Sequence, residues 1–437
     1  MAKQAQVEFT AVIKKAEDMD VTYIPVEFDV EKTFGKKRLK VKIWYDKILY
    51  RGLLTKYNGE YNLMINKNIR EQIGKDAGDK NILIAPLDWG LGHATRCMPL
   101  IDLLLQKKAN IIIAGNGDSF FLLKDSYPDL KFYELPGYDI SYAVAKNASV
   151  QTLLQGPKVL KTISKENKVI EEIVATEKID LIISDNRYGV RNANVKSILI
   201  CHHIALQAPD AMKFMNPILL KLHLRQIHKF DALWIPDEEN ETNLSGILSH
   251  NILFKIPHAF IGIQSRFANY KQEKSFIDEI DFEMLVVLSG PEPQRTYLET
   301  ELKKKLQTIS SKILLIRGKT ETDKTETVNN ITVINYLNTN DLFAALQKAK
   351  IIICRSGYST VMDLGVLGKK AIFIPAEGQT EQEYLAKILA EKGFAVECQQ
   401  HYLEIEKAIK KLETITGFHA YKTSTEKLEI ELNKHLI

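Results

Sequence analysis

Short apolar runs that alternate with helical stretches constrain this 437-residue chain more than any other feature. From residue 81 on, each run is apolar throughout, which is typical of strands buried on both faces. Such strands, when helices separate them, form parallel sheets covered by helices on both sides. The runs are NILIAP, NIIIAG, DLIISD and SILICHH, followed after residue 282 by EMLVVLSG, KILLIRG, IIICRSG and KAIFIPAEG. They predict two α/β domains in tandem, over residues 80–262 and 263–437.

The first 79 residues have a different pattern. Segments such as VEFTAVI and RLKVKIWY alternate apolar and polar residues with a period of two, and Pro25, Gly35, Gly52 and Gly59 separate the segments. This pattern predicts a small all-β domain over residues 1–79. One short helix is expected in NKNIREQIG, where the two apolar positions are one turn apart.

The overall charge and the cysteines exclude several classes of protein. The chain has 59 basic and 55 acidic residues, so no global excess drives nucleic-acid binding, and we expect no nucleic-acid partner. The four cysteines are far apart and predict reduced thiols rather than disulfides. No apolar stretch approaches the ~18 residues of a membrane span, and the start lacks a signal-peptide run. We therefore expect a cytoplasmic protein.

Ligands of parallel α/β sheets bind at the carboxyl ends of the strands, and the first such end reads IAPLDWGLGHATRC. Gly90 and Gly92 allow a sharp turn and close approach of the backbone to a ligand. His93 follows in the first turn of a helix, where the dipole favours anions and a neutral imidazole. A neutral histidine facing a cleft suits a general base. On this motif alone, a tight turn with a capping histidine is the simpler interpretation.

Two more strand ends carry candidate groups. Asp185 follows DLIIS and either orients His93, binds an acceptor hydroxyl, or only closes an Asx turn. After EMLVVL, a phosphate group could meet the backbone and side chains of Ser289, Gly290 and Arg295. These residues predict a second anion-binding position.

The fourth strand end, residues 351–386, is the most informative. Ser356 and Gly357 open a helix whose free N–H groups can receive a diphosphate. Asp363 lies two turns further on and could accept hydrogen bonds from ribose hydroxyls. The loop PAEGQTEQEY, which includes Glu377, can hold sugar hydroxyls with its amide and carboxylate groups.

This stretch resembles the donor-binding half of family 28 glycosyltransferases, and the resemblance extends over residues 81–437. The matching residues are Arg355-Ser356-Gly357, Asp363, Gly368 through Pro375, and Gln382-Glu383. The resemblance implies a GT-B fold of two Rossmann-like domains, with a last helix that crosses back to the first. It also implies donor-binding roles for four groups of residues, namely Gly357, Tyr358, Ser359 and Thr360 for phosphate, Asp363 for ribose, Tyr336 and Leu337 for uracil, and Gln382 and Glu383 for the sugar.

The resemblance implies transfer of a sugar, an N-acetylhexosamine, from a UDP-sugar to a hydroxyl of a glycan or lipid-linked acceptor. It further implies inversion with no metal or other cofactor, with His93 as the base and Asp185 as its helper. The motif GLGHATRC is closer to related UDP-sugar hydrolases, so hydrolysis remains an alternative. A third hypothesis is that the chain binds nucleotide-sugars without catalysing a reaction.

The first 79 residues are similar to a small bacterial domain family of unknown function with a split β-barrel fold. We expect an accessory module that binds a partner. In that family a further strand follows the Gly-Asp pair, but here Gly78-Asp79 runs directly into KNILIAP. One strand cannot serve two sheets, so the barrel is expected to be incomplete, strand-swapped or completed by another chain.

Two further segments have alternative interpretations. Residues 211–230, AMKFMNPILLKLHLRQIHKF, mix apolar and basic side chains, as in a helix lying on an anionic membrane. A helix packed on the sheet with a basic outer face explains them as well, and we favour it. The segment EDMD contains Asp18 and Asp20 in an Asp-x-Asp pattern, which we interpret as a turn rather than a metal site.

Overall fold

The computed structural model describes most of the chain, and it divides into two compact units, residues 1–80 with 433–437, and residues 81–432. The described residues are 7–9, 11, 13–15, 22–26, 28–45, 48–57, 59–73, 80–138, 156–290, 292–319, 325–421 and 425–436. Asp18, Asp20 and the Gly78-Asp79 pair lie outside them. None of the described helices has the length and apolarity that crossing a membrane requires.

The small unit is a sheet with two short helices. Its elements are β1 (Lys14–Lys15), β2 (Thr22–Pro25), α1 (Val30–Phe34), β3 (Leu39–Tyr45), β4 (Ile48–Tyr57), β5 (Glu60–Ile65) and α2 (Lys67–Ile73). The described strands pair antiparallel in the order β1-β2-β5-β4-β3. Val30 and Ile69 from the two helices pack with Leu54 and Leu63 on the inner face of the sheet. The expected helix is present as α2.

The first lobe of the large unit is a parallel sheet covered by helices. Its elements are β6 (Asn81–Pro86), α3 (Gly92–Gln106), β7 (Asn110–Gly115), α4 (Gly117–Ser126), β8 (Lys131–Glu134), α6 (Gly156–Glu177), β9 (Leu181–Asp185), β10 (Lys196–Ile200), η1 (Asp210–Met215), α7 (Asn216–Ile227), β11 (Ala232–Ile235), η2 (Gly246–Leu248) and β12 (His258–Phe260). The strand order is β12-β11-β10-β9-β6-β7-β8. The strand β6 thus lies inside this sheet, between β9 and β7, and the small unit does not use it.

The second lobe repeats this design. Its elements are η3 (Phe276–Glu279), β13 (Met284–Val287), α8 (Gln294–Leu306), β14 (Ile313–Ile316), β15 (Thr325–Val328), β16 (Ile331–Ile334), α9 (Thr339–Lys348), β17 (Ile351–Cys354), α10 (Tyr358–Leu367), β18 (Ala371–Phe373), α11 (Thr380–Glu391), β19 (Ala395–Glu397) and α12 (Ile405–Thr414). The order is β15-β16-β14-β13-β17-β18-β19, and among the described strands of this lobe only β15 and β16 pair antiparallel.

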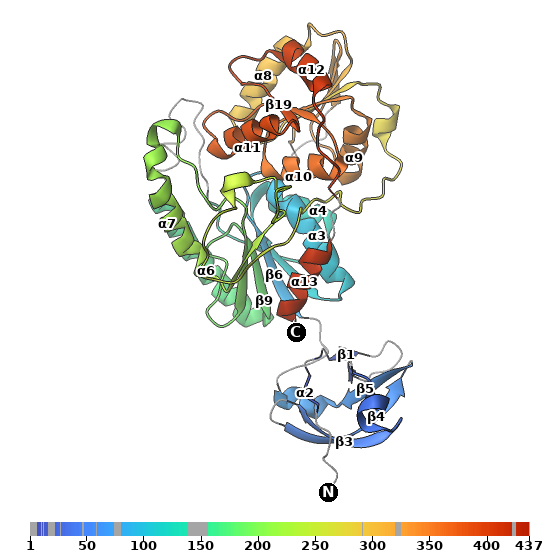
Figure 1. Ribbon diagram of the computed structural model, residues 1–437. Coiled ribbons are helices and arrows are strands. Elements are labelled where there is room, and N and C mark those ends of the chain that lie inside the picture. Colours follow the sequence, from blue (N-terminus) through green and yellow to red (C-terminus); the bar gives the residue numbers. More distant parts are fainter. Residues whose placement is uncertain are drawn as a thin grey trace. The chain divides into compact units, whose positions relative to one another are not determined.

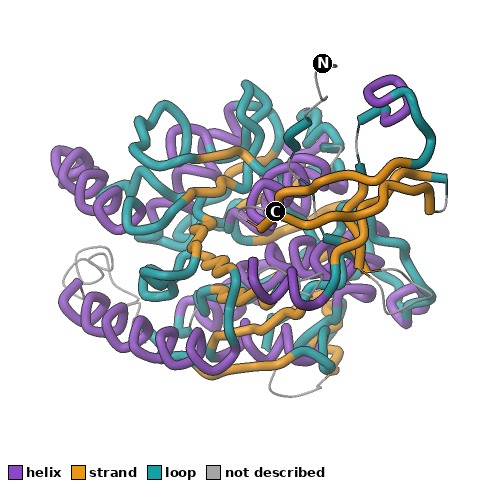
Figure 2. The backbone as a smooth tube through the Cα atoms, turned by 90° about the horizontal axis from the view of Figure 1, so that it is seen from below, coloured by secondary structure: helices purple, strands orange, loops and turns teal. Residues whose placement is uncertain are grey.

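Helices flank both sheets of the large unit (Figures 1 and 2). In the first lobe, Ile170 and Ile173 of α6 pack on strand residues such as Leu83 and Ile182. The last helix, α13 (Thr425–Leu436), returns to this lobe, where Glu429 Oε1 lies 2.6 Å from Nζ of Lys107, the C-cap residue of α3.

A buried arginine ties the strand ends of the first lobe together. Arg187 has no exposed surface, and it donates to Glu166 Oε1 (2.6 Å), Asn116 Oδ1 (2.8 Å) and the Pro136 carbonyl oxygen (2.8 Å). These partners come from α6 and from the segments that follow β7 and β8. The guanidinium therefore fixes the edge of the sheet at which a ligand would bind.

Arg187→Ala is expected to reduce the free energy of unfolding of the large unit by about 3–5 kcal/mol, because it leaves the buried Glu166 carboxylate without its cation. Urea unfolding followed by circular dichroism measures the change. Arg225→Ala, at an exposed position of α7, is the matched control and should change stability little. Equal stability of the two variants would contradict this structural role.

Candidate active site between the lobes

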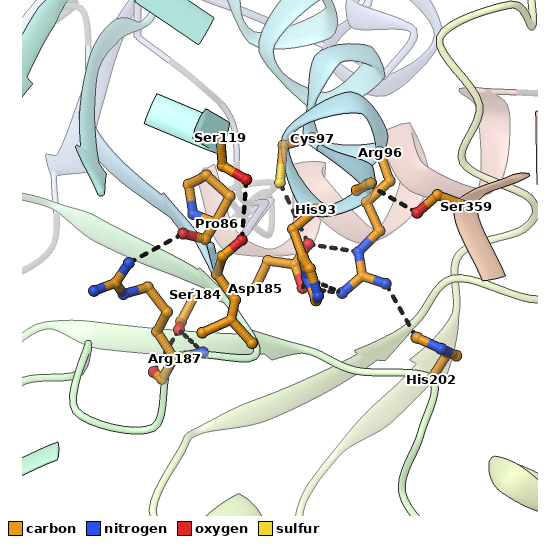
Figure 3. A network of polar contacts seen from close by, with 12 residues as sticks. Pro86, His93, Arg96, Cys97, Ser119, Ser184, Asp185, Arg187, His202 and Ser359 are labelled. Atoms are coloured by element: carbon orange, nitrogen blue, oxygen red, sulfur yellow. Dashed lines mark hydrogen bonds and ion pairs between the residues drawn. The ribbon is translucent and has the colours of Figure 1, made fainter. Parts of the chain in front are cut away.

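The centre of the candidate site is the carboxylate of Asp185 at the end of β9. It is fully buried, and β9 brings it opposite Pro86 at the end of β6. Arg96 Nε donates to Asp185 Oδ2 at 2.5 Å, and Arg96 Nη2 donates to the other carboxylate oxygen (Figure 3). Two parallel charge-assisted hydrogen bonds of this kind are strong and fix the relative orientation of the two groups.

The charges of this pair stabilise each other. Burial by itself raises the pKa of Asp185, but the charge of Arg96 and the hydrogen bonds from Arg96 and His93 outweigh burial and hold the pKa well below its usual range. Asp185 is therefore ionised at neutral pH. The same carboxylate keeps the Arg96 guanidinium charged although that side chain is buried.

His93 lies beside this pair, so the structure brings the two predicted catalytic residues together. Its Nδ1 is 3.1 Å from Asp185 Oδ1 and 2.7 Å from Arg96 Nη2. Burial, and then the charge of Arg96, lower the pKa of His93, so the ring is neutral at pH 7. When Nδ1 carries the proton it donates to Asp185 and leaves Nε2 free as a base, whereas a lone pair on Nδ1 accepts from Arg96.

A chain of polar contacts continues from Arg96 into the second lobe. Arg96 Nη1 lies 3.0 Å from His202 Nδ1, and because arginine only donates, this histidine carries its proton on Nε2. His202 Nε2 then donates to Glu381 Oε1 in the first turn of α11 at 2.8 Å. The other oxygen of Glu381 lies 3.1 Å from His203 Nδ1. Although burial opposes it, these two histidines lower the pKa of Glu381 well below its usual value.

The lobes also touch where α3 and α10 begin. Ser359 Oγ donates to the Gly92 carbonyl oxygen at 2.8 Å (Figure 3), and a Cβ on Gly92 would lie 2.6 Å from that hydroxyl oxygen. Glycine is therefore required for this approach. The ring of Tyr358 stacks on His202, with centroids 4.1 Å apart and planes 8° apart. Within the described part of the chain, no side chain caps either helix, so two uncapped N-termini meet here.

The remaining phosphate candidates follow the strands β6, β13 and β17. Gly90 and Gly290 take left-handed φ angles of 84° and 102°, as the tight turns require. Arg295 is held by the Gly318 carbonyl oxygen (2.6 Å) and Glu292 Oε1 (2.9 Å). Ser289 is exposed, and a Cβ on Gly357 would meet only open space, so both backbones are accessible.

Arg355 is buried and serves the fold. It donates to the Ile374 carbonyl oxygen at 3.0 Å and to Gln400 Oε1 at 2.6 Å. Burial lowers the pKa of Arg355 to about 10. The side chain thereby joins the ends of β17 and β18, directly before Ser356 and Gly357.

Asp363, predicted to bind the ribose, lies next to residues 261–275, the segment that joins the lobes. Asp363 Oδ1 accepts from Ser265 Oγ at 2.6 Å, and Arg266 Nε lies 3.9 Å from Oδ2. Burial raises the pKa of Asp363. Tyr336 is half-buried, whereas the side chain of Leu337 belongs to the core, so only the Leu337 backbone can meet a base.

The residues predicted for the sugar shape a loop. Gln382 Oε1 accepts from the Ala376 N–H at 2.9 Å, and Glu383 Oε1 accepts from the Gly378 N–H at 2.8 Å. Glu377 pairs with His401 at 2.5 Å. These contacts give the loop its form, and contact of the three side chains with a donor sugar stays a prediction. Among the described residues, no group of three or more His, Cys, Asp or Glu side chains could hold a metal ion.

Three residues of this network, Arg96, His202 and Glu381, have no individual role predicted from the sequence. Arg96 lies three residues after His93 on one helix, a spacing that places both on one face. His202 ends the apolar run SILIC, so the rule for strand ends applies to it. Glu381 gives no comparable signal, because its partner His202 is 179 positions away.

Comparisons with known proteins agree with this architecture. Residues 284–434 match the glycosyltransferase family 28 C-terminal domain, and residues 9–82 match a domain of unknown function, DUF1905. Among solved structures, the glycosyltransferase of kitacinnamycin aligns with a TM-score of 0.53 at 14% identity, over 82% of this chain and 95% of that one. The GT-B fold and both predicted family resemblances are confirmed.

Two relatives extend the comparison. The UDP-N-acetylglucosamine–N-acetylmuramyl-(pentapeptide) pyrophosphoryl-undecaprenol N-acetylglucosamine transferase of Histophilus somni is 42% identical over 77 residues, which are 17% of this chain and only 22% of that enzyme. An uncharacterized glycosyltransferase of Methanosarcina mazei is 23% identical over 395 residues, with 79% of this chain and 97% of that protein covered. The first similarity is local, and the second spans both lobes.

The buried histidine between the lobes predicts a loss of stability in acid. Burial is the main factor that lowers the pKa of His202, to about 4, so below about pH 6.5 the unfolded chain binds a proton that the folded chain does not. The free energy of unfolding should fall by up to about 1.4 kcal/mol per pH unit from this residue as the pH drops toward 4. His202→Gln should flatten the fall of the melting temperature over that range. The exposed His419→Gln is the control, and a curve for His202→Gln as steep as the wild-type curve would contradict the assignment.

Proposed function

We propose that this chain, a glycosyltransferase whose residues 284–434 form a family 28 C-terminal domain, transfers an N-acetylhexosamine from a UDP-sugar to a hydroxyl of a lipid-linked acceptor. One observation supports the proposal above the others, the meeting of two uncapped helix N-termini beside a buried His–Asp pair. The transferase from Histophilus somni, whose name states a UDP-N-acetylglucosamine donor and an undecaprenol-linked acceptor, supports the substrate class.

The diphosphate of the donor would bind where α3 and α10 begin. The positive ends of both helix dipoles point to this place, and the exposed N–H groups can donate to phosphate oxygens. The same groups would stabilise the charge that builds up on the leaving UDP, so no metal ion is needed for that step. Asp363 would accept hydrogen bonds from the ribose hydroxyls. The hydrogen bond from Ser265 Oγ to Asp363 Oδ1 would then break, so that this oxygen can bind ribose.

His93 would act as the base in an inverting displacement. The acceptor oxygen forms a bond to the anomeric carbon while the bond from that carbon to the diphosphate breaks, and UDP leaves with the electron pair. The hydroxyl proton passes to Nε2 of His93, and the resulting imidazolium donates from Nδ1 to Asp185. Arg96 is a positioning residue, because it holds Asp185 through both oxygens and competes for Nδ1.

Donor entry requires the lobes to separate in the region where Ser359 touches Gly92. The Glu381–His202 contact then opens as well, since both belong to the same face between the lobes. After the donor binds, closure restores the chain of contacts that ends at Asp185. Closure and the orientation of the base would thus be coupled.

The segment 211–230 would hold the enzyme on the membrane that carries its acceptor. Phe214, Ile218 and Leu222 are exposed by 76%, 55% and 50%, and the last two lie one helical turn apart on α7. Exposed basic side chains surround this apolar stripe, namely Lys213, Lys221, Arg225 and Lys229. His223 and Ile227 of α7 are buried, and Leu220 and Leu224 pack against the same core, so α7 is a packed helix, as we favoured from the sequence. Its outer face is apolar as well as basic.

His93→Ala should reduce sugar transfer by about 10²–10⁴-fold while leaving donor affinity nearly unchanged, because it removes the base and no donor contact. A radiolabelled UDP-N-acetylglucosamine assay with lipid-linked acceptors measures the rate, and calorimetry with UDP measures binding. EDTA should not change the rate, and His419→Gln is the control variant. Release of UDP and free sugar in water alone would instead indicate a hydrolase. UDP binding without turnover would indicate a sensor.

Replacing Phe214, Ile218 and Leu222 by serine should weaken sedimentation with anionic vesicles and slow transfer to a membrane-embedded acceptor, but not to a short-chain soluble one. The variant loses apolar area that would otherwise enter the interface. Serine at the exposed Phe121, Leu253 and Ile430 is the matched control. Unchanged sedimentation of the α7 variant would exclude this stripe as the membrane contact.

A further inference from the structure

The outer face of the sheet in the small unit has a composition that the fold alone does not explain. Side chains alternate along β3, so Leu39, Val41 and Ile43 pack inward, and Lys40, Lys42 and Trp44 point outward. The register places Lys42 opposite Arg51 and Trp44 opposite Leu49 on β4. Residues directly opposite each other share one face of the sheet, so these side chains form one surface.

This surface is strongly basic. Three more exposed cations, Lys36, Lys37 and Arg38, immediately precede β3. Within the described residues, no carboxylate forms an ion pair with Lys40, Lys42 or Arg51. Like charges directly opposite each other destabilise a sheet, and Lys42 and Arg51 are such a pair. Folding therefore gains nothing from this arrangement, whereas an anionic partner would relieve the repulsion.

Large apolar side chains lie among the cations. Trp44 is exposed by 64%, Leu49 by 44%, and Met64, which follows the inward Leu63 on β5, by 36%. An indole ring with basic neighbours is typical of protein surfaces that sit at a membrane interface. Residues 1–80 contain 16 basic and 12 acidic residues, and this excess of four equals the net charge of the whole chain.

We propose that this surface, the basic sheet face (Lys40, Lys42, Trp44, Leu49 and Arg51), binds an anionic lipid surface. The cations attract acidic headgroups, and Trp44 and Leu49 enter the interface between headgroups and acyl chains. Single-stranded nucleic acid is the less suitable partner, because it needs successive stacking rings. Along Lys40–Trp44 and Leu49–Leu53 this face carries one aromatic side chain, Trp44, and Tyr23 lies apart from it on β2, opposite Met64.

The proposal goes beyond the function proposed for the lobes and does not depend on it, since lipid binding needs neither donor nor acceptor. Lipid binding by the small unit would help to hold the glycosyltransferase lobes at a membrane. Stable attachment to a membrane usually takes two contacts, because one weak contact dissociates readily. The basic sheet face would be one contact, and the stripe on α7 the other.

Sedimentation of the full chain with vesicles tests the proposal. Vesicles of phosphatidylcholine with phosphatidylglycerol should retain the chain at low salt, and retention should fall at high salt and with phosphatidylcholine alone. Lys40→Glu/Lys42→Glu/Arg51→Glu should bind the anionic vesicles at least about tenfold more weakly. Lys407→Glu/Lys410→Glu/Lys411→Glu on α12 changes the net charge equally and should bind like the wild type.

A second measurement keeps the test independent of folding defects in the charge variant. Vesicles with brominated acyl chains should quench tryptophan fluorescence of the wild type, and Trp44→Phe should abolish most of that quenching. Equal retention of the two charge variants, or quenching that persists in Trp44→Phe, would overturn the proposal. Tighter binding to an RNA oligonucleotide than to anionic vesicles, lost in the Lys40/Lys42/Arg51 variant, would assign the face to nucleic acid instead.

Discussion

The charge of Asp185, buried at the end of β9, is the constraint on which the candidate site depends. A buried carboxylate without a cation is costly, so Arg96 must stay in place, and its guanidinium then directs His93 on one side and His202 on the other. His202 in turn meets Glu381 from the other lobe. A single buried charge in this way orders four further side chains, and one of them belongs to a different domain.

The two arginines near this strand end have different tasks. Arg187, two residues after Asp185, pairs with Glu166 and joins the strand ends of the first lobe away from the second lobe. Arg96 pairs with Asp185 and faces the second lobe. The Arg187–Glu166 pair makes the edge of the sheet rigid. The Arg96–Asp185 pair connects His93 to His202, which contacts the second lobe. Rigid support under a group that must be oriented is what a site for chemistry requires.

Much of this architecture could be predicted from the sequence, because strands buried on both faces leave continuous apolar runs. Every such run became a strand of a parallel sheet, and the helix over Lys67–Ile73 formed as expected. The strand β15 could not be predicted in this way, since Thr325–Val328 is a mainly polar strand at the edge of its sheet. The pair of His93 and Asp185 followed from the strand-end rule, whereas contacts across the lobes, such as Glu381 with His202, depend on how two separately folded domains meet.

The carboxylate of Glu381 lies close to the proposed diphosphate site, and two histidines bind it. It lies in the first turn of α11, one residue before Gln382, whose backbone oxygen accepts from Ser356 Oγ at 2.7 Å. A free carboxylate this close to the beginning of α10 would repel a diphosphate. His202 and His203 hold the two oxygens of Glu381, and His202 links this carboxylate to the Arg96 guanidinium. In the proposed reaction, this contact between the lobes would limit the repulsion between Glu381 and a diphosphate and would orient His93 through Arg96.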